Sequence, residues 1–319
     1  MTYSIPPVLA AELPPIKEVV SFGDSLTDAG TYWFRFTTNP GLTWAQHVAL
    51  HYGQDPLPNE HVEEYSQVYK GVAGKYGPGG LNYAQGGARA NNAYSQLSQD
   101  PEGVPVSAKV QVEHFLAQHQ SFLPDQLVTL YIGTNDVAYN YDPANDPLLA
   151  KLLRDNETPT PDVMAKEKAR IEQAAQDSAD ITREILARGA KRVLVFQLLD
   201  MGNLPWFRSK ASQVFMSAMS REFNEQLLKS LPKDPGILLI DTQKFVDELV
   251  AQGPAIGITH GAHEDACREV DQDYCYPNAL KTHNADQTYI YAAGEHMTTR
   301  ANALLAEYVL KQVAMSSLK

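Results

Sequence analysis

The sequence has no long run of apolar residues. No stretch approaches the roughly 18 to 20 consecutive apolar residues that a membrane-spanning helix needs. Residues 1–15, MTYSIPPVLAAELPP, also lack the basic start and the long apolar centre of a signal peptide. We therefore expect no transmembrane segment in this chain.

Basic residues are few and scattered. The chain carries 26 Lys and Arg against 38 Asp and Glu, which gives a formal net charge of -12. No cluster of Lys or Arg is longer than two residues. Because basic surfaces bind phosphate groups, this balance argues against a nucleic-acid partner, and it disfavours an anionic membrane surface for the same reason.

Cysteine is also scarce. The two cysteines, Cys267 and Cys275, lie close together in a polar stretch, HEDACREVDQDYCYPN. This spacing suits a local disulfide in a secreted or periplasmic protein whose signal peptide was removed before the sequence begins. The alternative is a pair of free thiols in a cytoplasmic protein.

Short apolar runs rich in β-branched residues alternate with longer amphipathic stretches. The runs predict buried strands at Glu18–Phe22, Leu81–Ala84, Leu127–Gly133, Arg192–Leu198 and Gly236–Thr242. Apolar residues near helical spacing predict helices over Lys166–Arg188, Ser220–Leu231 and Met297–Met315. Alternating strands and helices predict an α/β fold whose parallel sheet is covered on both faces, with ligands beyond the carboxyl ends of the strands.

The chain is long enough to bury a full core, because it has 319 residues of which 44% are hydrophobic. No stretch has the composition of a linker, so we expect a single domain over residues 1–319. Two stretches interrupt the alternation, at about 55–80 and 253–288. We interpret both as long loop insertions that could line a binding site.

One serine has the setting of a nucleophile. Gly23-Asp24-Ser25-Leu26 directly follows the first predicted strand. Ser25 would therefore lie on a strand-to-helix turn, where its hydroxyl is exposed and its own N–H points outward. A serine in this position can act as nucleophile and as oxyanion donor.

Three further blocks carry polar residues to the same edge of the predicted sheet. They are Asn82-Tyr83-Ala84-Gln85-Gly86-Gly87, Gly133-Thr134-Asn135-Asp136 and Gly294-Glu295-His296. In this order and at these distances, the four blocks resemble those of the GDSL esterases and lipases, also called SGNH hydrolases. The resemblance covers nearly the whole chain and implies a three-layer α/β/α sandwich with a mostly parallel, five-stranded, flavodoxin-like sheet.

The resemblance also implies a role for each block. Ser25 would be the nucleophile and His296 the general base and then acid. The oxyanion hole would comprise the N–H groups of Ser25 and Gly87 and the side-chain amide of Asn135. Asp24 and Asp136 flank these residues, and we expect their carboxylates to hold loops by accepting main-chain N–H bonds. Members of the family need no cofactor and no metal.

The chain departs from the family pattern at one position. Where the family usually has an aspartate three residues before the histidine, this chain has Ala293. Losing that acid can lower turnover by orders of magnitude. Four explanations stay open: another acceptor such as a main-chain carbonyl, a water or an anion orients His296; Glu295 substitutes; the protein binds esters without cleaving them; or Ala293 replaces a natural aspartate.

The sequence therefore predicts a carboxylic ester hydrolase that forms an acyl-enzyme on Ser25. An acyltransferase would use the same residues, with a second alcohol in place of water. A non-catalytic ester-binding protein is the third hypothesis, and Ala293 is its only support. The expected substrate is a small-molecule, lipid or carbohydrate ester, and the sequence does not distinguish among these.

Overall fold

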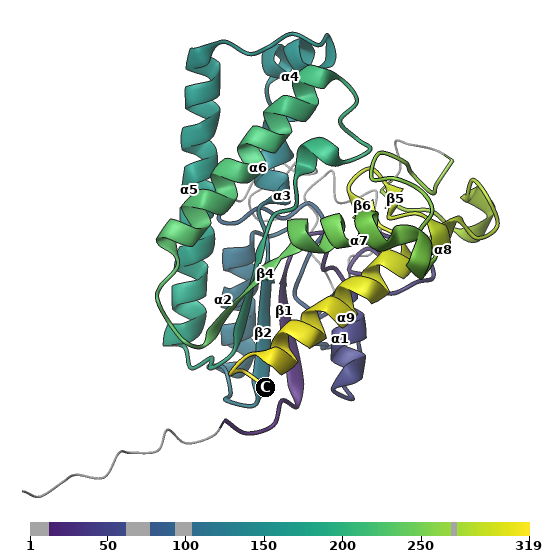
Figure 1. The fold of residues 1–319 in the computed structure, drawn as a ribbon. Helices are drawn as coiled ribbons and strands as arrows, with labels where there is room; N and C mark the ends of the chain where they lie inside the picture. Colours follow the sequence, from purple (N-terminus) through teal and green to yellow (C-terminus); the bar gives the residue numbers. More distant parts are fainter. Residues whose placement is uncertain (1–12, 62–76, 93–103, 269–272) are drawn as a thin grey trace, which may run out of the picture.

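A parallel sheet of four strands forms the centre of the computed structural model, which describes residues 13–61, 77–92, 104–268 and 273–319. The strands are β1 (Glu18–Gly23), β2 (Gln126–Tyr131), β3 (Val193–Gln197) and β4 (Ile237–Asp241), in the spatial order β1-β2-β3-β4 (Figure 1). Every residue of β2 is buried, since helices cover the sheet on both faces. The prediction of an α/β fold with a parallel sheet is confirmed.

One of the five predicted strands, Leu81–Ala84, does not form. Asn82 makes only isolated parallel bridges, to Ser21 on β1 and to Pro58. Its side chain explains the short pairing: its amide donates to the carbonyl of Thr27 at 2.8 Å and its oxygen accepts from the N–H of Ala84 at 3.1 Å. These bonds turn the chain away from an extended ladder. The prediction of five strands was wrong, although Asn82 lies where an edge strand would.

Helices cover the two faces of the sheet and give the molecule three layers (Figure 1). One layer contains α2 (Ala108–His119), α5 (Pro161–Ala187) and α6 (Lys210–Ser230), and the other contains α1 (Trp44–His51), α7 (Thr242–Ile256) and α9 (Thr299–Met315). Shorter elements follow the strand ends: α3 (Thr134–Ala138), η2 (Tyr139–Tyr141), α4 (Pro147–Arg154), η3 (Met201–Asn203), η4 (Pro277–Ala279) and α8 (Ala285–Thr288). A hairpin of β5 (Tyr291–Ala293) and β6 (His296–Met297) precedes α9.

Capping residues set where the long helices begin. The side chain of Thr160 accepts from the N–H of Val163, so α5 begins five residues before the predicted start. Ser209 caps α6 in the same way, by accepting from Ser212 at 3.0 Å. The helices were predicted from the spacing of apolar residues. The polar capping residues are not part of that spacing, so the predicted starts of α5 and α6 came too late in the chain.

The second of the two predicted loop insertions is only partly irregular. Residues 62–76 of the first lie outside the described residues. In the second, α7 continues to Ile256 and ends at Gly257, whose φ of 87° suits glycine, and α8 occupies Ala285–Thr288. Residues 253–256 and 285–288 were therefore wrongly assigned to a loop. The prediction of a single domain stays a prediction.

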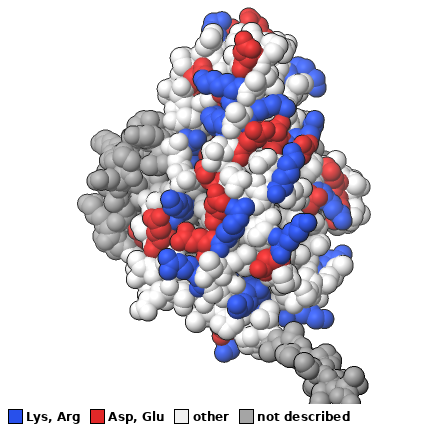
Figure 2. Space-filling view, turned by 90° about the vertical axis from the view of Figure 1, so that its left-hand side faces the viewer, with Lys and Arg blue, Asp and Glu red and all other residues white. Residues whose placement is uncertain are grey.

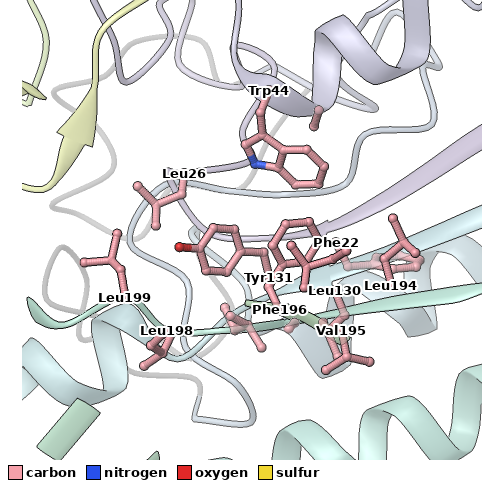
Figure 3. Close-up of a cluster of buried hydrophobic side chains, with 14 of the residues drawn as sticks. Phe22, Leu26, Trp44, Leu130, Tyr131, Leu194, Val195, Phe196, Leu198 and Leu199 are labelled. Carbon is pink, nitrogen blue, oxygen red and sulfur yellow. The ribbon is translucent and has the colours of Figure 1, made fainter. Parts of the chain in front are cut away.

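The hydrophobic core anchors the turn that follows β1. Figure 3 shows aromatic side chains from the strands and from α1 in this core. The ring of Phe196 lies 4.7 Å from that of Tyr131 and 4.6 Å from that of Trp44, centroid to centroid. Leu26, directly after Ser25, is buried and lines a small internal cavity with Trp44 and Tyr131. The apolar residue next to the serine thus fixes the turn against the core.

The surface over α5 and α6 mixes charges of both signs. Figure 2 shows basic and acidic side chains interleaved on this face. Lys168 pairs with Glu222 at 2.8 Å, and Arg170 pairs with Glu167 at 2.8 Å. Among the helices in the described ranges, none combines the length and the apolar character that a bilayer crossing requires.

Candidate active site

Ser25 lies on a tight turn at the carboxyl end of β1. The N–H groups of Thr27 and Asp28 both donate to the carbonyl of Asp24 at 3.0 Å, which closes the turn around the serine. Gly23 precedes the turn, and a Cβ there would come within 2.3 Å of the carbonyl oxygen of Tyr131 on β2. The sequence therefore needs glycine at the strand end, and the next residues present Ser25 beyond the sheet.

His296 meets Ser25 from the other end of the chain. It is the first residue of β6, and the β5–β6 hairpin turns through Gly294 at a φ of 59°. Its Nε2 lies 2.9 Å from the Oγ of Ser25, across 271 positions of sequence. A serine hydroxyl needs a base within hydrogen-bond reach to become a nucleophile. This distance meets that requirement.

The surroundings of His296 favour its neutral form. The side chain is 2% exposed, and burial lowers the pKa of the imidazole. The ring of Phe36 packs against it, with centroids 5.0 Å apart. A neutral imidazole can accept the proton of Ser25, so the burial suits a general base.

The three predicted oxyanion donors lie in the turn after β1, in the loop that holds Gly87 and in the first turn of α3, and these segments bond to one another. Gly87 has a φ of 86°, and the amide nitrogen of Asn135 donates to the carbonyl of Ala88 at 3.0 Å. A primary amide has two N–H bonds, so this contact fixes the side chain and leaves a second donor. Within the described part of the chain, the N–H groups of Ser25 and Gly87 donate no hydrogen bond. All three groups can therefore donate to a ligand.

Asp136 and Asp24 bond main-chain groups, as predicted. The carboxylate of Asp136 accepts from the N–H of Ala90 at 2.9 Å and from the Nε of Arg89 at 3.0 Å, which ties α3 to the loop that holds Gly87. Asp24 accepts from the N–H of Leu26 at 3.1 Å. Burial raises the pKa of Asp24 to about 7.

Asp28 is a residue of the site that the sequence analysis missed. Its carboxylate accepts from the N–H groups of Gly30, Thr31 and Gly86, at 2.8, 2.8 and 2.9 Å. It thereby joins the nucleophile turn to the loop that carries Gly87. Burial raises its pKa to about 6, against the lowering effect of these bonds. The one signal in the sequence is its place three residues after Ser25, which alone does not distinguish it from a surface aspartate.

Gly86 and Gly87 are required for different reasons. Gly87 has a left-handed φ, whereas a Cβ on Gly86 would lie 2.2 Å from Cζ of Phe36. We expect Gly86→Ala to lower the free energy of unfolding by about 1 to 3 kcal/mol, because the ring must move. We also expect kcat to fall about tenfold or more, because a displaced Gly87 N–H no longer reaches the oxyanion.

Urea unfolding and ester turnover measure these two effects. Gly261→Ala is the matched control, since its Cβ would approach only Oε1 of Glu264, at 3.8 Å. A Gly86→Ala variant as stable and as active as Gly261→Ala would contradict the packing argument.

No acid stands at the usual place beside His296. Ala293 is buried and packs in a small apolar cluster that includes both cysteines. Glu295 does not substitute for the acid: its Oε1 lies 3.8 Å from Nε2, the nitrogen that faces Ser25. Burial raises the pKa of Glu295 well above its usual range and lowers that of His296, which disfavours an ion pair between the two.

Cys267 and Cys275 are joined by a disulfide. The N–H of Cys267 donates to the carbonyl of Ala292 on β5 at 2.9 Å, so the disulfide lies beside the hairpin that carries His296. In the ranges that the structure describes, no three His, Cys, Asp or Glu side chains gather as a metal site.

The chain is similar to several known proteins. The chain is 26% identical over 315 residues to the phosphatidylcholine-sterol acyltransferase of Aeromonas hydrophila, covering 95% of this chain and 81% of that protein. Among solved structures it is similar to Est24, a carbohydrate acetylesterase from Sinorhizobium meliloti, at 16% identity and a TM-score of 0.45 over 94% of this chain and 99% of that one. It is also similar to Axe2, an acetylxylan esterase from Geobacillus stearothermophilus, at 13% identity and a TM-score of 0.41 over 97% and 99% of the two chains.

Structural likenesses at TM-scores this low say nothing about the chemistry of this chain. The family comparison is more specific, since the model of the GDSL-like lipase/acylhydrolase family matches residues 19–309. That range contains all four blocks, from Ser25 to His296. The chain belongs to the GDSL-like lipase/acylhydrolase family of ester-hydrolysing enzymes.

Proposed function

We propose that this protein is a carboxylic ester hydrolase that forms an acyl-enzyme on Ser25. The observation that carries the proposal is the 2.9 Å contact between Oγ of Ser25 and Nε2 of His296. Both side chains are almost fully buried, at 4% and 2% exposure, so neighbouring groups hold the contact. Family membership supports the same reaction class.

The reaction has two halves. In the first, Oγ of Ser25 attacks the ester carbonyl while Nε2 of His296 takes the hydroxyl proton. The tetrahedral intermediate collapses, and His296 gives the proton to the leaving alcohol. In the second half, His296 takes a proton from water, which attacks the acyl-enzyme, and Ser25 leaves with that proton. The free acid is the second product.

The negative charge of each intermediate needs fixed donors. We propose that the N–H groups of Ser25 and Gly87 and the free amide N–H of Asn135 supply them. One such donor is worth about 3 to 4 kcal/mol in comparable serine hydrolases. The bonds of Asp136 to Ala90 and of Asp28 to Gly86 keep the loops in register, so the donors are in place before the charge forms.

An acyltransferase is the second candidate. Its support is the 26% identity to a phosphatidylcholine-sterol acyltransferase over 95% of this chain. In that reaction an acceptor alcohol takes the place of water in the second half, and the residues of the first half are unchanged. We further propose an exported protein, because disulfides such as Cys267–Cys275 persist in oxidising compartments.

Ester turnover combined with serine labelling tests the proposal. We expect the protein to hydrolyse short p-nitrophenyl esters and a fluorophosphonate probe to abolish turnover when one equivalent is bound. Mass spectrometry of the digested protein should place the probe on the peptide that contains Ser25. Turnover that survives complete labelling, or no turnover of any ester, would contradict an acyl-enzyme on this serine.

Product analysis separates the two candidates. With an added acceptor alcohol, a hydrolase yields mainly the free acid, whereas an acyltransferase yields the new ester in proportion to the acceptor. Dominant ester formation would replace the hydrolase by the acyltransferase without changing the role of Ser25.

A further inference from the structure

His296 has a buried nitrogen that lacks a partner in the site as described so far. Its Nε2 contacts Ser25, so Nδ1 must carry the proton if Nε2 is to act as a base. In the portion of the chain that the structure describes, no hydrogen bond of normal geometry reaches Nδ1. A buried donor without an acceptor costs about 1 to 3 kcal/mol and leaves the tautomer unfixed. Some group must supply the missing acceptor.

The disulfide loop brings a candidate to this place. On one arm, Cys267 bonds β5 through the carbonyl of Ala292. On the other arm, the carbonyl of Cys275 accepts from the N–H of Asn39 at 2.7 Å. Asp273 precedes Cys275 by two residues. It therefore lies next to a cysteine that is fixed both by the disulfide and by its bond to Asn39.

A row of aromatic rings connects this segment to the imidazole. The ring of Tyr274 stacks on Phe34 with centroids 3.8 Å apart. Phe34 contacts Phe36 at 5.1 Å, and Phe36 contacts His296 at 5.0 Å. These rings pack the chain at Tyr274, directly after Asp273, against the same aromatic cluster that contacts the imidazole of His296.

Electrostatics agree with this placement. Burial lowers the pKa of His296, and the negative charge of Asp273 and its main-chain carbonyl, acting as an acceptor, both raise it. The same charge raises the pKa of Glu295. Both the charge and the main-chain carbonyl of Asp273 thus act on the imidazole, while the contact of the carbonyl with Nδ1 falls outside normal hydrogen-bond geometry. Catalytic hydrogen bonds in ligand-free enzymes are often long and tighten when substrate binds.

We propose that Asp273 is the positioning residue for His296, and this inference rests on the proposed function. Its carbonyl accepts the Nδ1–H bond, and its carboxylate supplies the negative charge that an aspartate at position 293 would supply in other family members. The Cys267–Cys275 disulfide holds Asp273 in place. The orienting group thus comes from a separate loop and not from the hairpin of the histidine.

Other acidic groups lie around His296 and bear on how its pKa is set. Glu295 lies on the Nε2 side, and burial raises its pKa well above the usual range. Asp24 is buried in the nucleophile turn with a pKa of about 7, and Asp265 bonds the N–H of Gly294 at 2.8 Å with its pKa raised by burial. Asp273 is the charge that acts on the pKa of His296.

The substitution Asp273→Asn tests the proposal, because it removes the charge and keeps the carbonyl. The enzyme is active only when His296 is neutral, so the acid limb of kcat/KM against pH follows the pKa of His296. Since the charge raises that pKa, its loss should move the acid limb to lower pH. We also expect kcat to fall about 10- to 100-fold, because the imidazolium loses its counter-charge, while KM changes little.

Control variants separate this role from a structural one. Asp286→Asn makes the same change of net charge on the exposed helix α8 and should leave kcat and the acid limb unchanged. The double variant Cys267→Ser/Cys275→Ser, checked for folding by circular dichroism, should move the acid limb in the same direction as Asp273→Asn. Adding Ala293→Asp to Asp273→Asn should restore part of kcat.

An acid limb unmoved in Asp273→Asn, whether kcat falls or not, would overturn the inference. The proposed function would stand in that case, as long as the unsubstituted protein hydrolyses esters through labelled Ser25. If the unsubstituted protein hydrolyses no ester, the proposed function fails first.

Discussion

Replacing Ser25 by alanine should lower kcat for p-nitrophenyl esters by at least about 10⁴-fold. The substitution removes the atom that would form the acyl-enzyme, and no other nucleophile replaces it, because the hydroxyl is the group at 2.9 Å from His296. In serine hydrolases, loss of the nucleophile alone costs nearly as much as loss of the whole catalytic set. Residual activity would come from the oxyanion donors acting on bound water.

The Ser25→Ala variant should otherwise remain close to the unsubstituted protein. It loses one hydrogen bond, worth about 0.5 to 1.5 kcal/mol, so thermal unfolding should shift by only a few degrees. Ser178→Ala is a matched control, since Ser178 is a buried serine that bonds the carbonyl of Ala174 in its own helix. Activity in Ser25→Ala comparable to that of Ser178→Ala would rule out the proposed nucleophile.

Replacing Asn135 by alanine should lower kcat by about 10² to 10³-fold with little change in KM. The oxyanion forms only in the transition state, so a donor aimed at it contributes to kcat more than to substrate binding. The amide of Asn135 is held by its bond to the carbonyl of Ala88, and no main-chain group can take its place. Steady-state kinetics with one ester across substrate concentrations separates kcat from KM.

Asn140→Ala is the control for this variant. Asn140 is also a buried asparagine, but its amide donates to Oε1 of Glu167 on α5 at 2.9 Å, away from Ser25. We expect it to lose stability, since Glu167 is left without that bond, and to keep kcat within a few-fold of the unsubstituted protein. Equal losses of kcat in the two variants would mean that Asn135 acts through folding and not as an oxyanion donor.

All four strands of the sheet were predicted from the sequence, from the fully buried β2 to the partly exposed β4. The short apolar runs at β1, β2 and β3 are typical of buried strands. Each of these strands was predicted to within two residues of its observed bounds. Leu81–Ala84 was predicted from the same signal, but the bonds of Asn82 to Thr27 and Ala84 limited it to isolated bridges. Side chains such as that of Asn82 compete with a neighbouring strand for main-chain hydrogen bonds, and a pattern of apolar residues does not reveal this competition.

By itself the sequence determined the reaction class to expect. Ser25, Asn135 and His296 are chemically suited to acyl transfer, and their order along the chain was enough for a family resemblance. The parallel sheet then brings Ser25 and Asn135 together, since the carboxyl ends of β1 and β2 meet at one edge. His296 comes from the separate β5–β6 hairpin. Nothing beyond local sequence and fold class was needed to place Ser25 and Asn135.

Only the tertiary structure decided how the site is supported. Asp28 contacts Gly86 across 58 positions, and Cys267 bonds Ala292 on β5, so neither contact leaves a signature in local sequence. Ala293 indicates from the sequence that the usual acid is absent, but the sequence does not indicate which group orients His296 instead. The placement of Asp273 depends on packing between Tyr274 and Phe34, residues far apart along the chain, and such packing is fixed by the folded chain as a whole.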